Sequence, residues 1–385
     1  MSNIKDLFVE YYGVEPTVIA KAPGRLEILG NHTDYNEGIT LSAAVDQATE
    51  FALVPVAGRE CCLHDFRDGS TKEFSLDNID DPTGGGWANY VKGVISQLKK
   101  RGIEIGAFNG AILSTVPLSA GMSSSAALEM SAGFAFKEQF GIDIPKADWA
   151  RIGQGVENEY MGANTGLLDQ FSSLFGEEDA LIYSDFRTVE VVRTVPLAHG
   201  YSIVVVNSMV KHNFTGESDY NIRRRLCEGA CAKLQTKFSE VKALRDVSSE
   251  MLEAGKDLLD NEEYLKAKHV VEECERVVLA TELLHKGDVE AFGQLLFDSH
   301  ESSRVNFDNS CPELDFLIEQ AKSIPGCIGA RLSGGGFGGI SIHLVEEDKA
   351  EEYCKQILSA FKLQTGIDTE TFICKVGAGA SVSRG

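Results

Sequence analysis

The chain has 385 residues, of which 43% are hydrophobic, and this is enough apolar material for a sizeable core. Its 58 acidic residues outnumber its 36 basic ones, so the net charge is −22. A chain of this charge is repelled by nucleic acid and by anionic membrane surfaces, and we expect neither as a partner.

The pattern along the chain predicts a cytoplasmic α+β protein. The N-terminal segment "MSNIKDLFVEYYG" is amphipathic and does not resemble a signal peptide, and no apolar run approaches the ~18 residues of a membrane span. The nine cysteines form no CxxC pair, which is typical of reduced thiols in the cytoplasm. We expect no metal site built from the eight dispersed histidines.

The chain divides by composition into two halves. The first half mixes strands, glycine-rich loops and one Ala-rich helix, and "YSIVVVNS" at 201–208 predicts a buried strand. Helical spacing dominates from about residue 218 to residue 300, and strands return with "GISIHLV" at 339–345 and "TFICKVG" at 371–377. Because strands and helices do not alternate regularly, we predict two α+β domains, 1–190 and 191–385.

The segment "GRLEILGNHTDYNEG", residues 24–38, carries polar groups through an apolar stretch. Arg25, His32 and Asp34 suit neither a plain core strand nor a plain surface loop. Its leucines and its isoleucine can anchor the segment in the core, which would hold the polar groups rigidly. The pattern indicates a binding or catalytic segment.

A second segment, "PLSAGMSSSAALEMSAGFAF" from Pro117, places a Gly/Ser loop before an apolar helix. Such a loop presents unpaired backbone N–H groups and the positive end of a helix dipole, which suits a phosphate. The alternative is an ordinary serine N-cap on a buried helix. It is not a Walker A loop, since no Gly-Lys-Ser/Thr follows.

Two further segments carry groups that need an explanation. Residues 156–176, "VENEYMGANTGLLDQFSSLFG", hold Glu157 on a predicted helix and Asp169 among apolar neighbours. A carboxylate in that setting needs a partner, so Asp169 either caps the next helix or acts as a general base or phosphate-aligning group. In "GARLSGGGFGGISIHLV", from Gly329, clustered glycines precede a strand, which fits either a tight turn or a close backbone approach and not a Rossmann motif.

These segments together resemble the GHMP small-molecule kinases and, within them, the galactokinase family. Residues 24–38 are similar to the galactokinase signature, the serine loop resembles the ATP-phosphate loop, and the glycine cluster resembles the third motif. "WANYVKGV", "TGLLDQF" and "MVKHNFTGESDYNIRRRLC" also look like galactokinase segments. The resemblance implies a two-lobed fold with the site in the cleft, and transfer of the ATP γ-phosphate to the anomeric hydroxyl of a sugar, galactose above all.

The resemblance also implies a role for individual residues. Asp169 would be the catalytic base and Arg25 its partner, while Ser125 and Glu157 would bind Mg²⁺. The ATP phosphates would lie on the loop formed by Gly121, Ser123, Ser124 and Ser125, with Trp87 beside the adenine. The sugar would be contacted by Asn31, His32, Asp34, Gly166, Asp169 and Tyr220. We expect a monomer that acts on a small sugar.

Two positions depart from the signature. Glu27 stands where the family has Asn, and Asn31 stands where the family has a Glu that accepts a hydrogen bond from the C6 hydroxyl. An uncharged Asn31 would not repel a C6 carboxylate, so a uronic acid such as galacturonate is one candidate substrate. Alternatively Glu27, four residues away, returns the carboxylate and the substrate is galactose.

Other functions fit the sequence less well. A non-catalytic sugar sensor on the same fold should lack the base or the serine loop, and both are present. A GHMP kinase for mevalonate or homoserine should lack "HTDY" and "YNIRRR", and both are present as well.

Overall fold

A computed structural model describes residues 3–84, 86–117, 121–197, 199–210 and 219–385. Two of the segments singled out above, the loop after Pro117 and "MVKHNFTGESDYNIRRRLC", lie partly outside these residues. No helix within the described ranges combines the length and apolar character that crossing a membrane requires.

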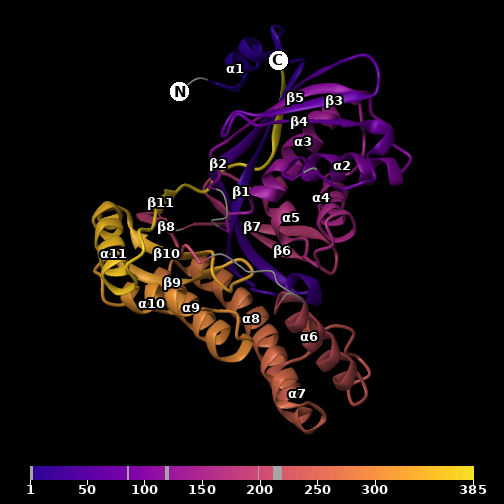
Figure 1. Cartoon of the computed structure of the whole chain (residues 1–385). Helices are drawn as coiled ribbons and strands as arrows, with labels where there is room; N and C mark the ends of the chain where they lie inside the picture. The colour runs from indigo at the N-terminus through magenta and orange to yellow at the C-terminus, as the bar shows by residue number, and fades with distance from the viewer. Residues whose placement is uncertain (1–2, 85, 118–120, 198, 211–218) are drawn as a thin grey trace.

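The first half of the chain builds a large sheet, to which the C-terminal strand returns (Figure 1). Its strands are β1 (Val18–Leu29), β2 (Ile39–Pro55), β3 (Glu60–Asp65), β4 (Thr71–Ser75), β5 (Phe108–Ser114), β6 (Ala180–Asp185), β7 (Glu190–Pro196) and β12 (Ser381–Arg384). The order is β12-β1-β2-β5-β3-β4, and β6 pairs with β2 and β7. All neighbours are antiparallel except β3 and β5, which are parallel.

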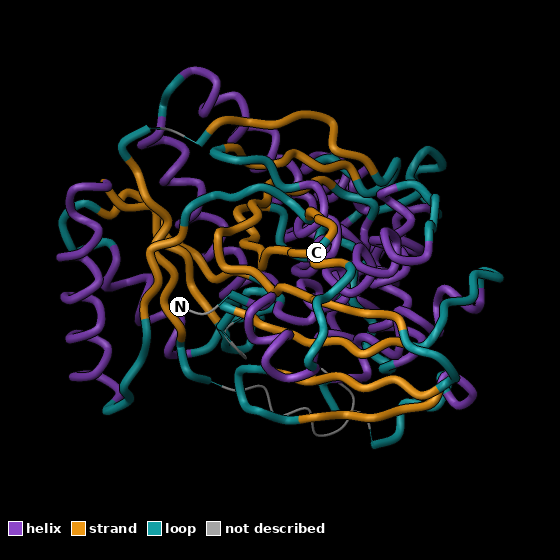
Figure 2. Tube along the Cα trace, turned by 90° about the horizontal axis from the view of Figure 1, so that it is seen from above, coloured by secondary structure: helices purple, strands orange, loops and turns teal. Residues whose placement is uncertain are grey.

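The second sheet lies in the C-terminal half and has the order β11-β8-β10-β9, with every pair antiparallel. Its strands are β8 (Tyr201–Asn207), β9 (Cys327–Ser333), β10 (Ile340–Glu346) and β11 (Thr371–Cys374). The strands predicted at 201–208, 339–345 and 371–377 are confirmed as β8, β10 and β11. Figure 2 shows long strands running side by side with helices packed beside them.

Helices cover both sheets. Those before β8 are α1 (Ile4–Tyr12), α2 (Ala88–Lys100), α3 (Ser124–Phe140), α4 (Lys146–Gly155) and α5 (Leu168–Phe175). Those after it are α6 (Asp219–Gln235), α7 (Ser249–Ala254), α8 (Asn261–Lys286), α9 (Val289–Ser302), α10 (Pro312–Ala321) and α11 (Ala350–Thr365). The helical character predicted for about 218–300 is confirmed for 219–300, while residue 218 lies outside the described part.

Local signals explain where several helices begin and end. In α1 the Asn3 side chain accepts a hydrogen bond from the Asp6 N–H, and Gly13 ends the helix at a φ of 72°. In α8 Asp260 and Glu263 form a capping box, and Gly287 ends the helix in the same left-handed conformation.

The hydrophobic core between the two sheets holds in place the segments that carry the candidate site. Its buried side chains come from β1 and β2 in one lobe and from β8, β10, α8 and α9 in the other. Leu26, Ile28 and Leu29 of β1 belong to this core. The apolar residues of the opening motif therefore anchor it at the junction of the two lobes, as the sequence predicted.

Candidate active site

Strand β1 delivers Arg25 to the centre of the candidate site. Its Nε donates to Oδ1 of Asp169 at 2.8 Å, and its Nη2 donates to Oδ2 at 2.9 Å. The remaining guanidinium nitrogen, Nη1, donates to the backbone carbonyl of Gly121 at 2.6 Å. The Arg25 side chain is only 6% exposed, against 30% for Asp169. The structure thus joins three of the predicted residues, and Asp169 remains accessible at the surface of the pair.

The serine loop contacts the same carboxylate. Ser123 has a φ of 52°, in the left-handed region, and makes no side-chain cap bond to α3. Its hydroxyl donates to Oδ2 of Asp169 instead. Ser123 thus stands at the N-cap position of α3 but does not cap the helix through its side chain. Ser124 is the first residue of α3.

Ser125 and Glu157, which the resemblance assigns to Mg²⁺, are hydrogen-bonded to each other. The Ser125 hydroxyl donates to Oε1 of Glu157 at 3.0 Å, and Thr165, which the sequence did not single out, donates to Oε2 at 2.5 Å. Glu157 lies in a short π-helical segment, η3 (Val156–Tyr160), and is buried. Burial, followed by the nearby Asp169 carboxylate, raises the pKa of Glu157.

A further carboxyl group, also missed from the sequence, lies behind this pair. Glu129 is fully buried on α3, one helical turn after Ser125, and accepts a hydrogen bond from Nε2 of Gln170 at 2.9 Å. Burial and then the Glu157 charge raise its pKa well above the usual range. A glutamate inside the otherwise apolar run "SSAALEMSAGFAF" was the signal that could have revealed it.

Asp34 and Gly166 are in direct contact. The Asp34 carboxylate accepts hydrogen bonds from the Tyr35 N–H at 2.9 Å and from the Leu168 N–H at 3.2 Å. A Cβ on Gly166 would lie 1.7 Å from Oδ2 of Asp34, so only glycine leaves room for the carboxylate. Leu168 directly precedes Asp169 on α5, so the Asp34 carboxylate is bonded to the residue next to the candidate base.

His32 is enclosed by rings and has both nitrogens engaged. Its Nδ1 lies 2.8 Å from the Tyr35 hydroxyl, and its Nε2 lies 3.2 Å from the carbonyl oxygen of Gly335. The ring contacts Phe307 and Tyr220, with centroid distances of 4.3 and 4.9 Å. Burial lowers the pKa of His32 to about 3. The imidazole is therefore neutral, and Nε2 carries the proton because its partner can only accept.

The polar side-chain atoms of Asn31 and Trp87 are bonded to other protein groups. Asn31 is 1% exposed and bonded on all sides by protein groups, which leaves its side chain no free position for a sugar. Trp87 precedes α2, packs against the core of the first lobe and donates its indole N–H to Ser70 at 3.0 Å.

The third motif turns tightly against the second lobe. Gly336 has a φ of 80°, and a Cβ there would lie 2.1 Å from the backbone oxygen of Asn309. The carbonyl of Gly334 accepts a hydrogen bond from Asn31 at 2.9 Å. Glycine is therefore required at position 336 for a close approach to the backbone of Asn309, which agrees with the second of the two interpretations.

Comparisons with known proteins agree with this geometry. The galactokinase galactose-binding signature matches residues 6–55, the N-terminal domain of GHMP kinases matches residues 89–177, and their C-terminal domain matches residues 280–363. Structures called mevalonate kinase share the fold at 19% identity, with a TM-score of 0.59 over 93% of this chain and 98% of the other.

Galactokinases are similar to the chain over nearly its whole length. Galactokinase of Chloroflexus aggregans is 37% identical, with 99% of this chain and 97% of that protein covered. Galactokinase of Actinobacillus pleuropneumoniae serotype 3 is 39% identical, with 95% of each covered. The crystal structure of Lactococcus lactis galactokinase complexed with galactose matches at 32% identity and a TM-score of 0.93 over 98% of both chains. The chain belongs to the galactokinase family of GHMP kinases.

Proposed function

We propose that this protein transfers the γ-phosphate of ATP to the anomeric hydroxyl of galactose. The observation that carries the proposal is the Arg25–Asp169 pair, which lies between the serine loop and the Asp34–Gly166 contact. A sugar held by Asp34 would present a hydroxyl to Asp169, and ATP held by the serine loop would present its γ-phosphate to Arg25. Membership of the galactokinase family supports both halves of this assignment.

Asp169 is proposed as the general base. Its side chain is 30% exposed and can take the proton of the attacking hydroxyl. Arg25 holds both carboxylate oxygens and leaves a fixed positive charge beside the group being transferred. Phosphoryl transfer depends mainly on positioning and on stabilising the charge of the phosphoryl oxygens, and this pair provides both.

The donor set of Ser125 and Glu157 fits Mg²⁺. Their oxygens lie 3.0 Å apart, and Mg²⁺ in phosphoryl-transfer sites takes one or two protein oxygens together with phosphates and waters. The described residues contain no cluster of three or more His, Cys, Asp or Glu side chains for a metal, so we assign no all-protein cage. A bound Mg²⁺ would neutralise charge on the ATP phosphates.

Asp34, His32, Gly166 and Tyr220 are proposed to line the sugar. Asp34 has a carboxylate that can accept hydrogen bonds from vicinal hydroxyls and so reject the wrong epimer. A C6 carboxylate is disfavoured, because the side-chain amide of Asn31, which stands at the signature position that meets the C6 hydroxyl, is fully bonded to protein groups and has no donor left for a carboxylate. This favours galactose over galacturonate.

The remaining assignments are proposals of the same kind. We propose that Gly121, Ser123 and Ser124 line the ATP phosphates, that Trp87 lies beside the adenine, and that the domains divide near residue 190. We further propose a cytoplasmic monomer, which agrees with the nine cysteines, all among the described residues and none in a disulfide.

One assay tests the function. ATP consumption is measured with galactose, glucose, galacturonate and N-acetylgalactosamine as acceptors, with and without Mg²⁺. We expect Mg²⁺-dependent turnover with galactose to exceed that with each other sugar. Absence of turnover with all four sugars, in a protein that is folded by circular dichroism, would refute the proposal.

A further inference from the structure

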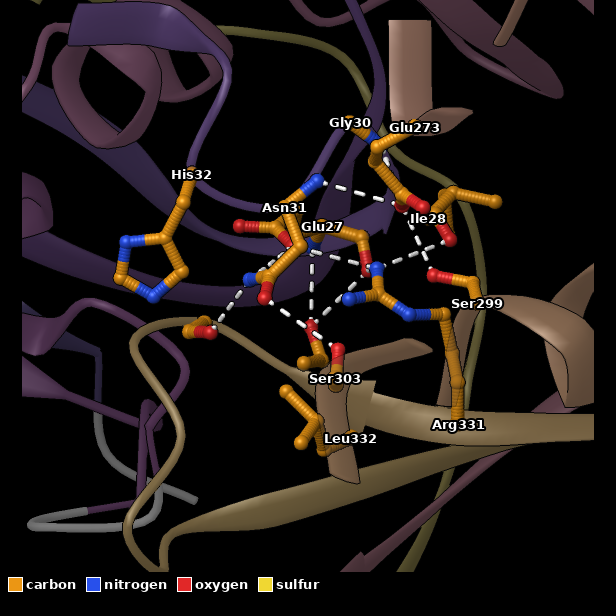
Figure 3. A network of polar contacts seen from close by, with 12 residues as sticks. Glu27, Ile28, Gly30, Asn31, His32, Glu273, Ser299, Ser303, Arg331 and Leu332 are labelled. Carbon is orange, nitrogen blue, oxygen red and sulfur yellow. Dashed lines mark hydrogen bonds and ion pairs between the residues drawn. The ribbon is translucent and has the colours of Figure 1, made fainter. Parts of the chain in front are cut away.

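A buried ion pair lies beneath the candidate sugar residues and has no role in the function proposed above. Arg331 on β9 has a completely buried side chain, and its Nη1 donates to Oε1 of Glu27 on β1 at 3.1 Å (Figure 3). The Glu27 side chain is 7% exposed. The pair joins two strands that are about 300 residues apart in the sequence and belong to different sheets.

Arg331 also holds the backbone of β1. Its Nη1 donates to the carbonyls of Ile28 at 3.1 Å and of Glu27 at 3.4 Å. Ser333 adds two reciprocal bonds of 3.0 Å: it accepts from the Glu27 N–H and donates to the Glu27 carbonyl. Within the described residues, Glu27 is the one acid that pairs with Arg331, whose Nε and Nη2 have no hydrogen-bond partner there. Loss of the carboxylate would remove the direct ion-pair partner of this buried guanidinium, leaving only the more distant charge of Glu273.

Asn31 links the Glu27–Arg331 pair to the turn that precedes the candidate sugar residues. Its Nδ2 donates to Glu27 at 2.7 Å and to the Gly334 carbonyl at 2.9 Å. Its Oδ1 accepts from Asn309 at 3.0 Å and from Ser303 at 3.5 Å. An amide has two donors and two acceptor positions, and all four are used here. The resemblance implied that Asn31 contacts the sugar, but the structure makes it a link between protein groups.

The next links reach the candidate sugar residues. Asn309 donates from the same Nδ2 to the Gly335 carbonyl at 3.2 Å, and His32 donates to that carbonyl as well. His32 directly follows Asn31 and adopts a left-handed φ of 59°, which costs free energy unless the surroundings impose it. The contacts of Asn31 and of the Gly334–Gly336 turn help to hold this conformation, together with the Asn36 amide, which donates to the His32 carbonyl at 2.8 Å.

We infer that Arg331 is a positioning residue for sugar phosphorylation, acting through Glu27 and Asn31 on the turn that carries His32 and Asp34. The inference rests on the proposed function. The inference explains why Glu27 and Asn31 both depart from the signature. The carboxylate at position 27 faces the Arg331 guanidinium, and the amide at position 31 donates to the Gly334 carbonyl. A glutamate at position 31 alone would bring two carboxylates together and face a carbonyl that needs a donor.

The test uses two variants. Glu27→Gln keeps the shape of the side chain and removes its charge, and Arg331→Lys keeps the positive charge and removes the planar guanidinium group. We expect each variant to raise the KM for galactose by about tenfold or more, a fold-change typical of one lost charge-assisted contact. The KM for ATP should stay within about twofold, since no bond of the network reaches the serine loop.

Glu263→Gln is the matched control. Glu263 is also a buried glutamate paired with a cation from another element, at 2.5 Å to Lys233, but it lies at the start of α8. We expect it to lower the melting temperature without changing either KM. A purely structural role for Glu27 would give this same result.

A double variant separates stability from positioning. Glu27→Gln with Arg331→Met removes both charges, so no charge is left unpaired, and we expect much of the lost thermal stability to return. The KM for galactose should remain raised, because the bonds from Arg331 to the β1 carbonyls are still missing. The double swap Glu27→Asn with Asn31→Glu should keep more galactose activity than either single change, because it keeps one carboxylate and one amide in the network.

Failure of the inference is distinct from failure of the function. If wild-type protein phosphorylates no sugar, the proposed function is wrong. If wild type is active, while folded Glu27→Gln and Arg331→Lys keep a KM for galactose within about twofold of wild type, the positioning role is refuted and the kinase assignment stands. A KM that recovers along with stability in the Glu27→Gln/Arg331→Met variant would also refute it.

Discussion

Arg25 and Asp169 are joined by two parallel hydrogen bonds, 2.8 Å from Nε to Oδ1 and 2.9 Å from Nη2 to Oδ2, across 144 residues of sequence. This fork geometry fixes the plane of the carboxylate, which a single lysine could not do. It leaves Asp169 partly exposed while the arginine beneath it is buried. The pair lies between the sugar part and the phosphate part of the candidate site, so variants on either side of it test the two parts separately.

Replacing Asp169 by Asn should abolish turnover and spare sugar binding. The amide keeps the shape of the side chain but cannot accept a proton, so kcat should fall by about a thousandfold. Binding of galactose, measured by calorimetry, should persist because Asp34 and Gly166 are untouched. Asp148→Asn, an exposed aspartate paired with Arg151, is the control. A kcat within about tenfold of wild type would remove Asp169 from the role of base.

Gly166→Ala should damage the sugar side selectively. The new methyl group would overlap the Asp34 carboxylate, 1.7 Å away, and force it out of place. We expect the KM for galactose to rise by about tenfold or more while the KM for ATP changes little. Gly106→Ala serves as a control, since a Cβ there would meet Phe140 at an ordinary 3.5 Å. Unchanged galactose kinetics would mean that Asp34 does not contact the sugar.

Ser125→Ala and Glu157→Gln should each raise the Mg²⁺ concentration needed for half-maximal rate by several-fold. Each change removes one oxygen donor, or its charge, from a pair that lies 3.0 Å apart. Thr165→Ala should have a smaller effect, because Thr165 only holds the second oxygen of Glu157. If the Mg²⁺ requirement does not move in either primary variant, the metal site lies elsewhere.

Wild-type protein should prefer galactose to galacturonate by about a hundredfold in kcat/KM, because both donors of the Asn31 amide are used by protein groups and none is left for a C6 carboxylate. Initial rates over a range of each sugar, at fixed Mg²⁺ and ATP, measure the ratio. Talose, which keeps a neutral C6, controls for tolerance of other changes in the ring. Equal efficiency on galactose and galacturonate would restore the uronic acid alternative.

Protein stability should fall on acidification partly because of His343. This buried residue lies between Ser341 and Tyr353, and burial lowers its pKa to about 3. In the unfolded chain this histidine has a pKa of about 6.5, so it binds a proton as the pH falls below that value, whereas in the folded chain it stays neutral until about pH 3. Its contribution to the free energy of unfolding is therefore complete above pH 6.5 and is lost as the pH falls.

The size of this effect can be isolated with His343→Gln. The difference in free energy of unfolding between wild type and variant should shrink by about 1.4 kcal/mol per pH unit between roughly pH 6 and pH 4. Urea titrations at pH 7.5, 5.5 and 4.5 measure it. Parallel pH dependences for the two proteins would show that His343 is not the group responsible.

The sequence by itself determined the elements and most of the chemistry. Hydrophobic patterning located β8, β10, β11 and the helical region after residue 219, because that signal is local. The residues around Asp169 identified it as a carboxylate that needed a partner, and the family resemblance implied Arg25 for that role and a shared Mg²⁺ for Ser125 and Glu157. A charged side chain among apolar neighbours can be recognised from its flanking residues alone.

Only the tertiary structure shows which residues are the hydrogen-bond partners of these polar groups. Ser123 looked like a helix cap until its left-handed backbone turned the hydroxyl toward Asp169. Asn31 looked like a sugar ligand until Glu27, Gly334 and Asn309 occupied its amide. Arg331 carried no local signal, because its partner lies 304 residues away on another sheet. A hydrogen bond acts over about 3 Å, so only the packing of the two lobes can fix which distant groups it joins.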